Sequence, residues 1–168
     1  MIVMIIYAII SFLFDGLISN YTSINIVNPS YLRTIFSLIS LVVMLSYFEN
    51  NAKYLKILIP LGILFDIVYT NTFLLNIFLF LIIYLILRKI DFYIPNNVFT
   101  INLKSLIAIC IYHSLSYLIL LLVHYNTYPS NSLLTILSHS IIMTIIYTTI
   151  SYFLIKKIYS IKYDKKIK

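Results

Sequence analysis

Six apolar runs, separated by short polar breaks, cover most of this chain. Their lengths are comparable to the ~20 residues that a helix needs to cross the ~30 Å hydrocarbon core of a bilayer. In lipid a helix satisfies its own backbone amides, whereas an open sheet edge does not, and the strands of a barrel alternate polar and apolar residues. We therefore expect an all-α, polytopic integral membrane protein. The runs are residues 2–18, 32–48, 55–69, 73–87, 103–123 and 133–155.

The composition agrees with a chain that is mostly surrounded by lipid. Hydrophobic residues make up 62% of the 168 residues and charged residues 10%, whereas a soluble domain carries about 25% charged residues. The first run has no Lys or Arg before it and no small-residue cleavage site after it, so we interpret it as a retained span. The sequence predicts a single transmembrane domain over residues 1–168, ending in a basic tail at 156–168.

The number of spans depends on the stretch between Lys56 and Arg88. Its 31 residues would form a helix of about 46 Å, well above the ~30 Å of the hydrocarbon core. Two shorter helices joined near residues 70–72 fit the bilayer better. We expect a bundle of six transmembrane helices, and five spans remain possible.

Charge predicts the orientation. The tail at 156–168 contains six lysines and one aspartate, which is five of the seven net positive charges, and cytoplasmic loops are enriched in Lys and Arg. With six spans both termini are then cytoplasmic, Arg88, Lys89 and Lys104 lie on that side as well, and Arg33 alone lies outside. We expect the lysine-rich tail to contact anionic lipid of the inner leaflet. Six lysines beside a membrane do not indicate nucleic-acid binding.

Two acidic residues within apolar runs are the candidate functional residues. Asp15 and Asp66 each lie near the outer end of a span in the six-span arrangement, at a depth similar to that of Arg33. An intramembrane carboxylate is costly unless it is paired, so we predict a structural or partner-facing polar cluster in which Arg33 pairs with one acid or both. Separate solvation of each acid at the interface is the alternative. The only glycines, Gly16 and Gly62, lie within one helical turn of the acids and favour close helix packing.

The sixth run carries small hydroxyl residues on one helical face. Their spacings of four, four and three place them together, and small hydroxyl residues allow helices to approach closely and to form hydrogen bonds across the contact. We interpret this face as a helix-packing face, with a substrate-lining role as the alternative. The residues are Ser140, Thr144, Thr148 and Ser151.

No pattern in the chain is typical of catalysis or of cofactor or metal binding. The three histidines include no i, i+4 pair, the single Cys110 has no partner cysteine, and two glycines are too few for a phosphate-binding loop. Ser114 beside His113 points about 100° away on a helix, so the two cannot act as nucleophile and base. We expect a protein without enzymatic activity, although a site assembled from several spans would leave no local pattern.

With the spans placed, the first ninety residues resemble the MreD family of bacterial rod shape-determining membrane proteins. The segment 12–17 (FLFDGL) closes the first span, and the segment 61–66 (LGILFD) closes the third before a polar turn and Asn76. In that family a glycine-rich run ends in Asp, and a glycine or asparagine opens the next span. Here Gly62 is the one glycine that remains of the run.

The resemblance implies a non-enzymatic scaffold of the cell-elongation (rod) complex in the bacterial cytoplasmic membrane. Such proteins associate with the single-span protein MreC and, through it, with MreB filaments and the peptidoglycan synthases. The alternative is the substrate-binding subunit of an energy-coupling-factor vitamin transporter, to which the MreD family is similar in fold. Those subunits commonly carry an A-x-x-x-A docking motif in the first span, where this chain has Ala8 followed by Phe12.

Overall fold

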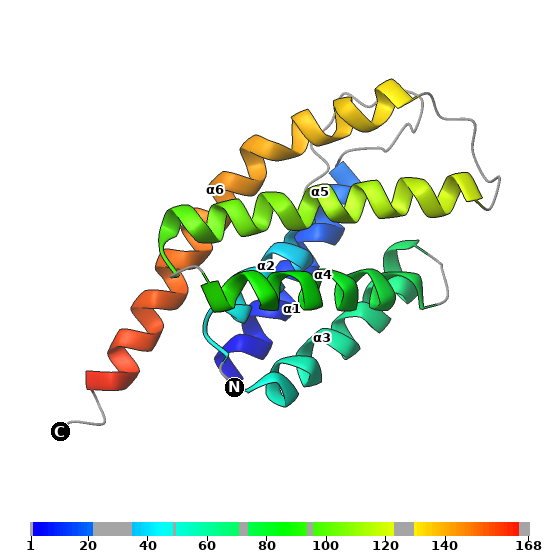
Figure 1. Ribbon diagram of the computed structural model, residues 1–168. Coiled ribbons are helices and arrows are strands. Elements are labelled where there is room, and N and C mark those ends of the chain that lie inside the picture. The colour runs from blue at the N-terminus through cyan, green and yellow to red at the C-terminus, as the bar shows by residue number, and fades with distance from the viewer. Residues whose placement is uncertain are drawn as a thin grey trace.

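The computed structural model describes residues 2–21, 35–48, 50–70, 74–93, 96–122 and 130–164, and these are almost entirely helical, with no strand among them (Figure 1). The expectation of an all-α chain is confirmed. Helix α6 crosses the bundle and extends beyond the other helices toward the C-terminus. The elements are α1 (Ile2–Tyr21), α2 (Phe36–Leu45), α3 (Asn51–Phe65), the π-helix η1 (Asp66–Thr70), α4 (Leu75–Tyr93), α5 (Val98–Leu122) and α6 (Ser130–Asp164).

The third and fourth apolar runs form separate helices, as their combined length predicts. Helix α3 starts after Asn50, whose side-chain oxygen accepts hydrogen bonds from the amides of Ala52 (2.8 Å) and Lys53 (3.4 Å), the usual role of a helix N-cap. The helical path continues through η1 to Thr70, and Leu74 precedes α4 with a φ of 61°. Pro60 lies inside α3 rather than in its first turn.

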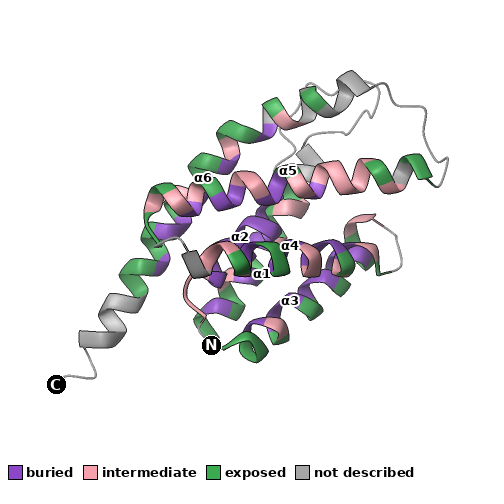
Figure 2. Cartoon of the chain, in the orientation of Figure 1, coloured by how far each residue is buried: buried purple, intermediate pink, exposed green. Residues whose placement is uncertain are grey.

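Helix α2 is the centre of the bundle. It packs against α1, α3, α4, α5 and α6, and all ten of its residues are buried (Figure 2). Ten residues make a helix of only about 15 Å, shorter than the run 32–48 suggested, because Ser46 and Tyr47 form a turn. Residues 32–34 lie outside the described ranges. A helix enclosed on every side explains why this run is apolar at almost every position.

The outer helices expose broad apolar faces. Among the described residues, Val98–Ile119 and Ser140–Ile158 are long and apolar enough to cross a membrane, and only 33% and 28% of an apolar 18-residue window in each are buried inside the protein. A core helix of a water-soluble protein would instead be mostly enclosed. Large contiguous apolar surfaces of this kind usually mark contact with lipid or with another protein.

Candidate functional site

Asp15 caps the start of α2 from a neighbouring helix. Its carboxylate accepts hydrogen bonds from the main-chain amides of Phe36 (2.7 Å) and Ser37 (2.8 Å) and from the Ser37 hydroxyl (2.5 Å). The first amides of a helix have no partner within the helix, and Ile35 at the N-cap offers no side-chain acceptor. Asp15 therefore supplies the missing acceptor, and its negative charge faces the positive end of the α2 dipole.

Asp66 caps the start of α4 in the same way and is more deeply buried than Asp15. One carboxylate oxygen accepts from the main-chain amide of Asn76 (3.0 Å) and from its side-chain amide (2.8 Å), and the other lies 3.4 Å from the amide of Ile77. Asp66 is only 3% exposed. The π-helical turn that begins at this residue ends at Thr70, whose hydroxyl lies 3.4 Å from the carboxylate.

The Asp66 cap is joined to a third helix through Asn76. The Tyr112 hydroxyl of α5 donates to the side-chain oxygen of Asn76 (2.5 Å), while the Asn76 side-chain nitrogen also donates to the Thr70 hydroxyl (2.9 Å). Asn76 is fully buried and Tyr112 is nearly so. A buried side-chain amide that has both its donors and its acceptor engaged holds η1, α4 and α5 in one arrangement.

Tyr69 connects the two segments that carry the capping acids, α1 with Asp15 and η1 with Asp66. Its hydroxyl donates to the main-chain oxygen of Phe12 in α1 (2.6 Å), and its ring packs 4.8 Å from the Phe12 ring and 5.1 Å from the Phe65 ring, centre to centre. A Cβ placed on Gly16 would lie 2.6 Å from the Tyr69 hydroxyl. The absence of a side chain at position 16 thus allows the contact between η1 and α1.

Gly62 serves a comparable purpose between α3 and α4. A Cβ at this position would lie 3.1 Å from the backbone Cα of Ile77 and 3.0 Å from its side chain. The two helices approach each other there because Gly62 has no side chain. Gly62 and Asp66 therefore both act on the same turn of α4, which contains Asn76 and Ile77.

The predicted cluster of Asp15, Asp66 and Arg33 is resolved in part. Asp15 lies near the end of α1 and Asp66 at the end of α3, and Tyr69 links these two regions. Arg33 lies outside the described residues, so its pairing with either acid stays a prediction. The acceptor role of the carboxylates toward helix amides was not predicted from the sequence. Ser37 and Asn76, polar residues in the N-terminal parts of two apolar runs, were the available signal.

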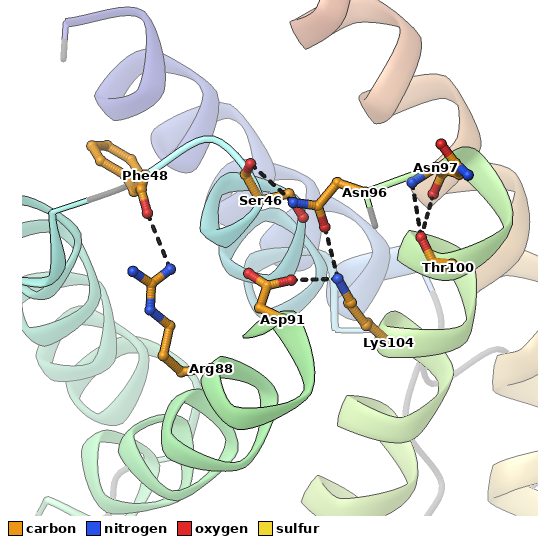
Figure 3. A network of polar contacts seen from close by, with 8 residues as sticks. All are labelled: Ser46, Phe48, Arg88, Asp91, Asn96, Asn97, Thr100 and Lys104. Atoms are coloured by element: carbon orange, nitrogen blue, oxygen red, sulfur yellow. Dashed lines mark hydrogen bonds and ion pairs between the residues drawn. The ribbon is translucent and has the colours of Figure 1, made fainter. Parts of the chain in front are cut away.

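A buried ion pair joins α4 to α5 (Figure 3). The Lys104 ammonium contacts the carboxylate of Asp91 and donates to the side-chain oxygen of Asn96 (2.7 Å). The side chains of Lys104 and Asp91 are 2% and 7% exposed. In the sequence, Lys104 served only to predict which side of the membrane its loop faces. In the structure, it forms an ion pair that joins α5 to α4. Nearby, Arg88 donates to the main-chain oxygen of Phe48 (3.3 Å).

The small hydroxyl residues of α6 face the interior. Ser140, Thr144, Thr148 and Ser151 are each at most 1% exposed, on a helix that packs against α5 and α2. The Thr144 hydroxyl donates to the main-chain oxygen of Ser140 (2.6 Å). A hydrogen bond also joins α6 to α5, since the side-chain nitrogen of Asn102 of α5 donates to the Thr149 hydroxyl of α6 (3.0 Å).

The carboxylates, Asn76, Asn102 and Lys104 connect helices to one another, whereas the hydroxyls of Ser140 and Thr144 donate to carbonyls of α6 itself. Among the described residues, no three His, Cys, Asp or Glu side chains are grouped so that they could hold a metal ion. The carboxylates of Asp15 and Asp66 are occupied by helix amides in a geometry suited to stabilising the bundle. Comparison with protein-family models, with curated proteins and with solved structures found no match.

Proposed function

We propose that this chain is a multi-pass membrane scaffold of the bacterial cell-elongation machinery, as the resemblance to the MreD family implies. One observation carries the proposal: the residues behind the resemblance act on a single contact. Asp66 accepts from the main chain and side chain of Asn76, and Gly62 allows the backbone of the same α4 turn to approach α3. Gly62 and Asp66 therefore hold α3 and α4 together.

A locking role suits a scaffold better than a transport or relay role. A proton relay needs carboxylates that exchange partners, whereas Asp15 and Asp66 are each held by at least two hydrogen bonds to the start of a helix. In the proposed arrangement the helices cross the cytoplasmic membrane with both termini on the cytoplasmic side. The short α2 is surrounded by its neighbours, so it would need little contact with lipid.

The alternative function is that of a substrate-binding subunit of a vitamin transporter. Docking of such subunits uses the face of the first span that carries the A-x-x-x-A motif. Here Ala8 is 2% exposed, and the Phe12 ring packs against Tyr69 of η1 at 4.8 Å. This face of α1 is thus directed into the bundle, which supports the scaffold role.

The first test is genetic. Complete loss of the protein from a rod-shaped host is expected to produce round cells and to misplace wall synthesis. Normal rods with normal wall incorporation would contradict the proposal. A small molecule that stays bound to the purified protein and is identified as a vitamin would replace the scaffold role by the transporter role.

The second test identifies the partner. A photo-crosslinking amino acid at Ile63 or Ile67, which are 40% and 69% exposed, is expected to capture a single-span MreC-like protein. The matched control is Leu58, which lies on α3 with Ile63, is fully buried and should give no crosslink. Scanning the exposed apolar positions of the remaining helices without capturing such a protein would count against the scaffold role.

A further inference from the structure

An apolar groove separates α1 from the second half of α6. It has a volume of about 550 Å³ and is lined almost entirely by apolar side chains, among them Ile6 and Ile10 of α1 and Ile146, Ile150 and Leu154 of α6. These five side chains are between 46% and 55% exposed, so the groove is open along its length.

Two contacts hold the walls of the groove in place. The Ser11 hydroxyl of α1 and the Tyr147 hydroxyl of α6 share a hydrogen bond of 2.7 Å. The Tyr147 ring also packs edge-on against Phe36, with ring centres 4.6 Å apart. Because these contacts tie α6 to both α1 and α2, the two walls keep their separation and the groove is a persistent feature of the fold.

The shape of the groove fits one hydrocarbon chain. Its lining on α6 runs from Met143 to Ile158, which is about 22 Å of helix. The lining is apolar along this whole length. An extended hydrocarbon chain can lie along such a lining and contact its side chains at about 3.5–4.0 Å.

A cation follows the apolar lining at one end of the groove. Lys157 comes three residues after Leu154 and seven after Ile150, so it lies on the same face of α6 as the lining. Lys157 is exposed and adjoins the lining residue Ile158. Lys156, whose ammonium lies 5.7 Å from the centre of the Tyr152 ring, adds a second charge at this level. An apolar groove that ends at cations matches a lipid with an anionic head group.

We propose that the groove between α1 and α6 binds one acyl chain of an anionic phospholipid, with its phosphate against Lys157. The proposal rests on the membrane location of the chain and is independent of its scaffold role. A bound lipid would fill the space between two helices that the protein itself leaves apart, and would thereby stabilise the packing of α6 on the bundle.

The test measures retention of phosphatidylglycerol and phosphatidylcholine by the full chain, using native mass spectrometry after release from a mild detergent. We expect phosphatidylglycerol to be retained preferentially. Ile150→Trp, which fills the groove, should weaken retention about tenfold by excluding part of the acyl chain, and Lys157→Gln should weaken it about fivefold. Ile6→Trp repeats the block from the opposite wall, so the result does not depend on a single folded variant.

Matched controls place the same changes elsewhere. Leu64→Trp and Lys56→Gln alter exposed positions of α3 and should leave retention unchanged. Equal retention of both lipids, or unchanged phosphatidylglycerol retention in the groove variants, would overturn the proposal. Loss of a single-span protein partner from Ile150→Trp with unchanged lipid retention would also overturn it, because the groove would then be a helix-docking site.

Discussion

Asp15 and Asp66 perform one task in two different settings. Both carboxylates accept hydrogen bonds from the first amides of a helix that follows later in the chain. The Asp66 carboxylate binds the amide of Asn76, 10 residues later in the chain, and is 3% exposed. Asn76 in turn accepts a hydrogen bond from Tyr112 of α5. The Asp15 carboxylate binds amides 21 and 22 residues later, is partly exposed and, among the described residues, accepts one further hydrogen bond from the Ser37 hydroxyl.

The difference indicates that burial and coupling, rather than the carboxylate itself, set the importance of each cap. The donors of both caps are buried, but Asp66 is itself buried and binds two donors of Asn76, which is coupled to α5. Loss of the partly exposed Asp15 side chain, in contrast, leaves a space that water can enter to replace the lost acceptor. The Asp66 cap should therefore contribute more to stability than the Asp15 cap. It is also the cap that lies in the segment resembling the third-span motif of the MreD family.

The largest effect is expected from substitutions of Asp66. Asp66→Ala removes the acceptor of two Asn76 donors and should lower the free energy of unfolding by about 3 kcal/mol. Asp66→Asn keeps one carbonyl acceptor and should cost less, and Asp66→Lys, which turns a cation toward the α4 amides, should cost most. Thermal unfolding in detergent, followed by circular dichroism, measures this order. An Asp66→Lys protein as stable as the parent would refute the cap.

Gly62→Ala should produce the next largest loss. The added Cβ meets the α4 backbone at Ile77, which cannot move independently of the helix, so overpacking should cost about 2 kcal/mol. Gly16→Ala is the matched comparison, since its added Cβ meets only the end of the Tyr69 side chain. In a Tyr69→Phe background Gly16→Ala should become neutral, because the obstructing hydroxyl is gone, while Gly62→Ala should remain costly. Equal behaviour of the two glycines would contradict this distinction.

Asp15→Ala should have a smaller effect than Asp66→Ala. Loss of a helix cap at a partly exposed position is expected to cost about 1.5 kcal/mol. The same unfolding measurement applies, and Ser37→Ala serves as the control that removes only the hydroxyl donor. A loss that exceeds that of Asp66→Ala would reverse the proposed order of the two caps.

Tyr112→Phe should produce the smallest of these changes, about 1 kcal/mol, because it removes one hydrogen bond to Asn76 and keeps the ring. It also tests the coupling. Combined with Asp66→Ala it should cost less than the sum of the two single changes, whereas combined with Asp15→Ala the two costs should add. Additive behaviour in both pairs would show that the Asp66 cap is not coupled to α5.

Much of the secondary structure follows from the sequence. The apolar runs predicted the helices, and the length of the stretch between Lys56 and Arg88 predicted two helices where one was conceivable. These features depend on residues close together in the chain. Helix ends were less accurate: α4, α5 and α6 extend beyond their apolar runs, for example to Asp91 and Tyr93 in α4, because polar residues continue a helix once it is anchored.

The candidate site was located by the sequence but not explained by it. Two acids in apolar runs identified Asp15 and Asp66, since charge is costly there. The identity of their partners depended on which helix starts the fold brings to each carboxylate, and main-chain amides carry no signature in a sequence. For the same reason Lys104 gave no indication of its ion pair with Asp91, 13 residues earlier.

The sequence by itself therefore determined the helical class, the approximate helices and the residues whose burial needs a compensating partner. Only the tertiary structure decided that α2 is enclosed on all sides, that each acid caps a helix start, and that α1 and α6 leave a groove between them. The physical reason is the range of the interactions. Hydrophobic runs and backbone hydrogen bonds of helices act over a few residues, whereas caps, ion pairs and grooves arise where distant segments meet.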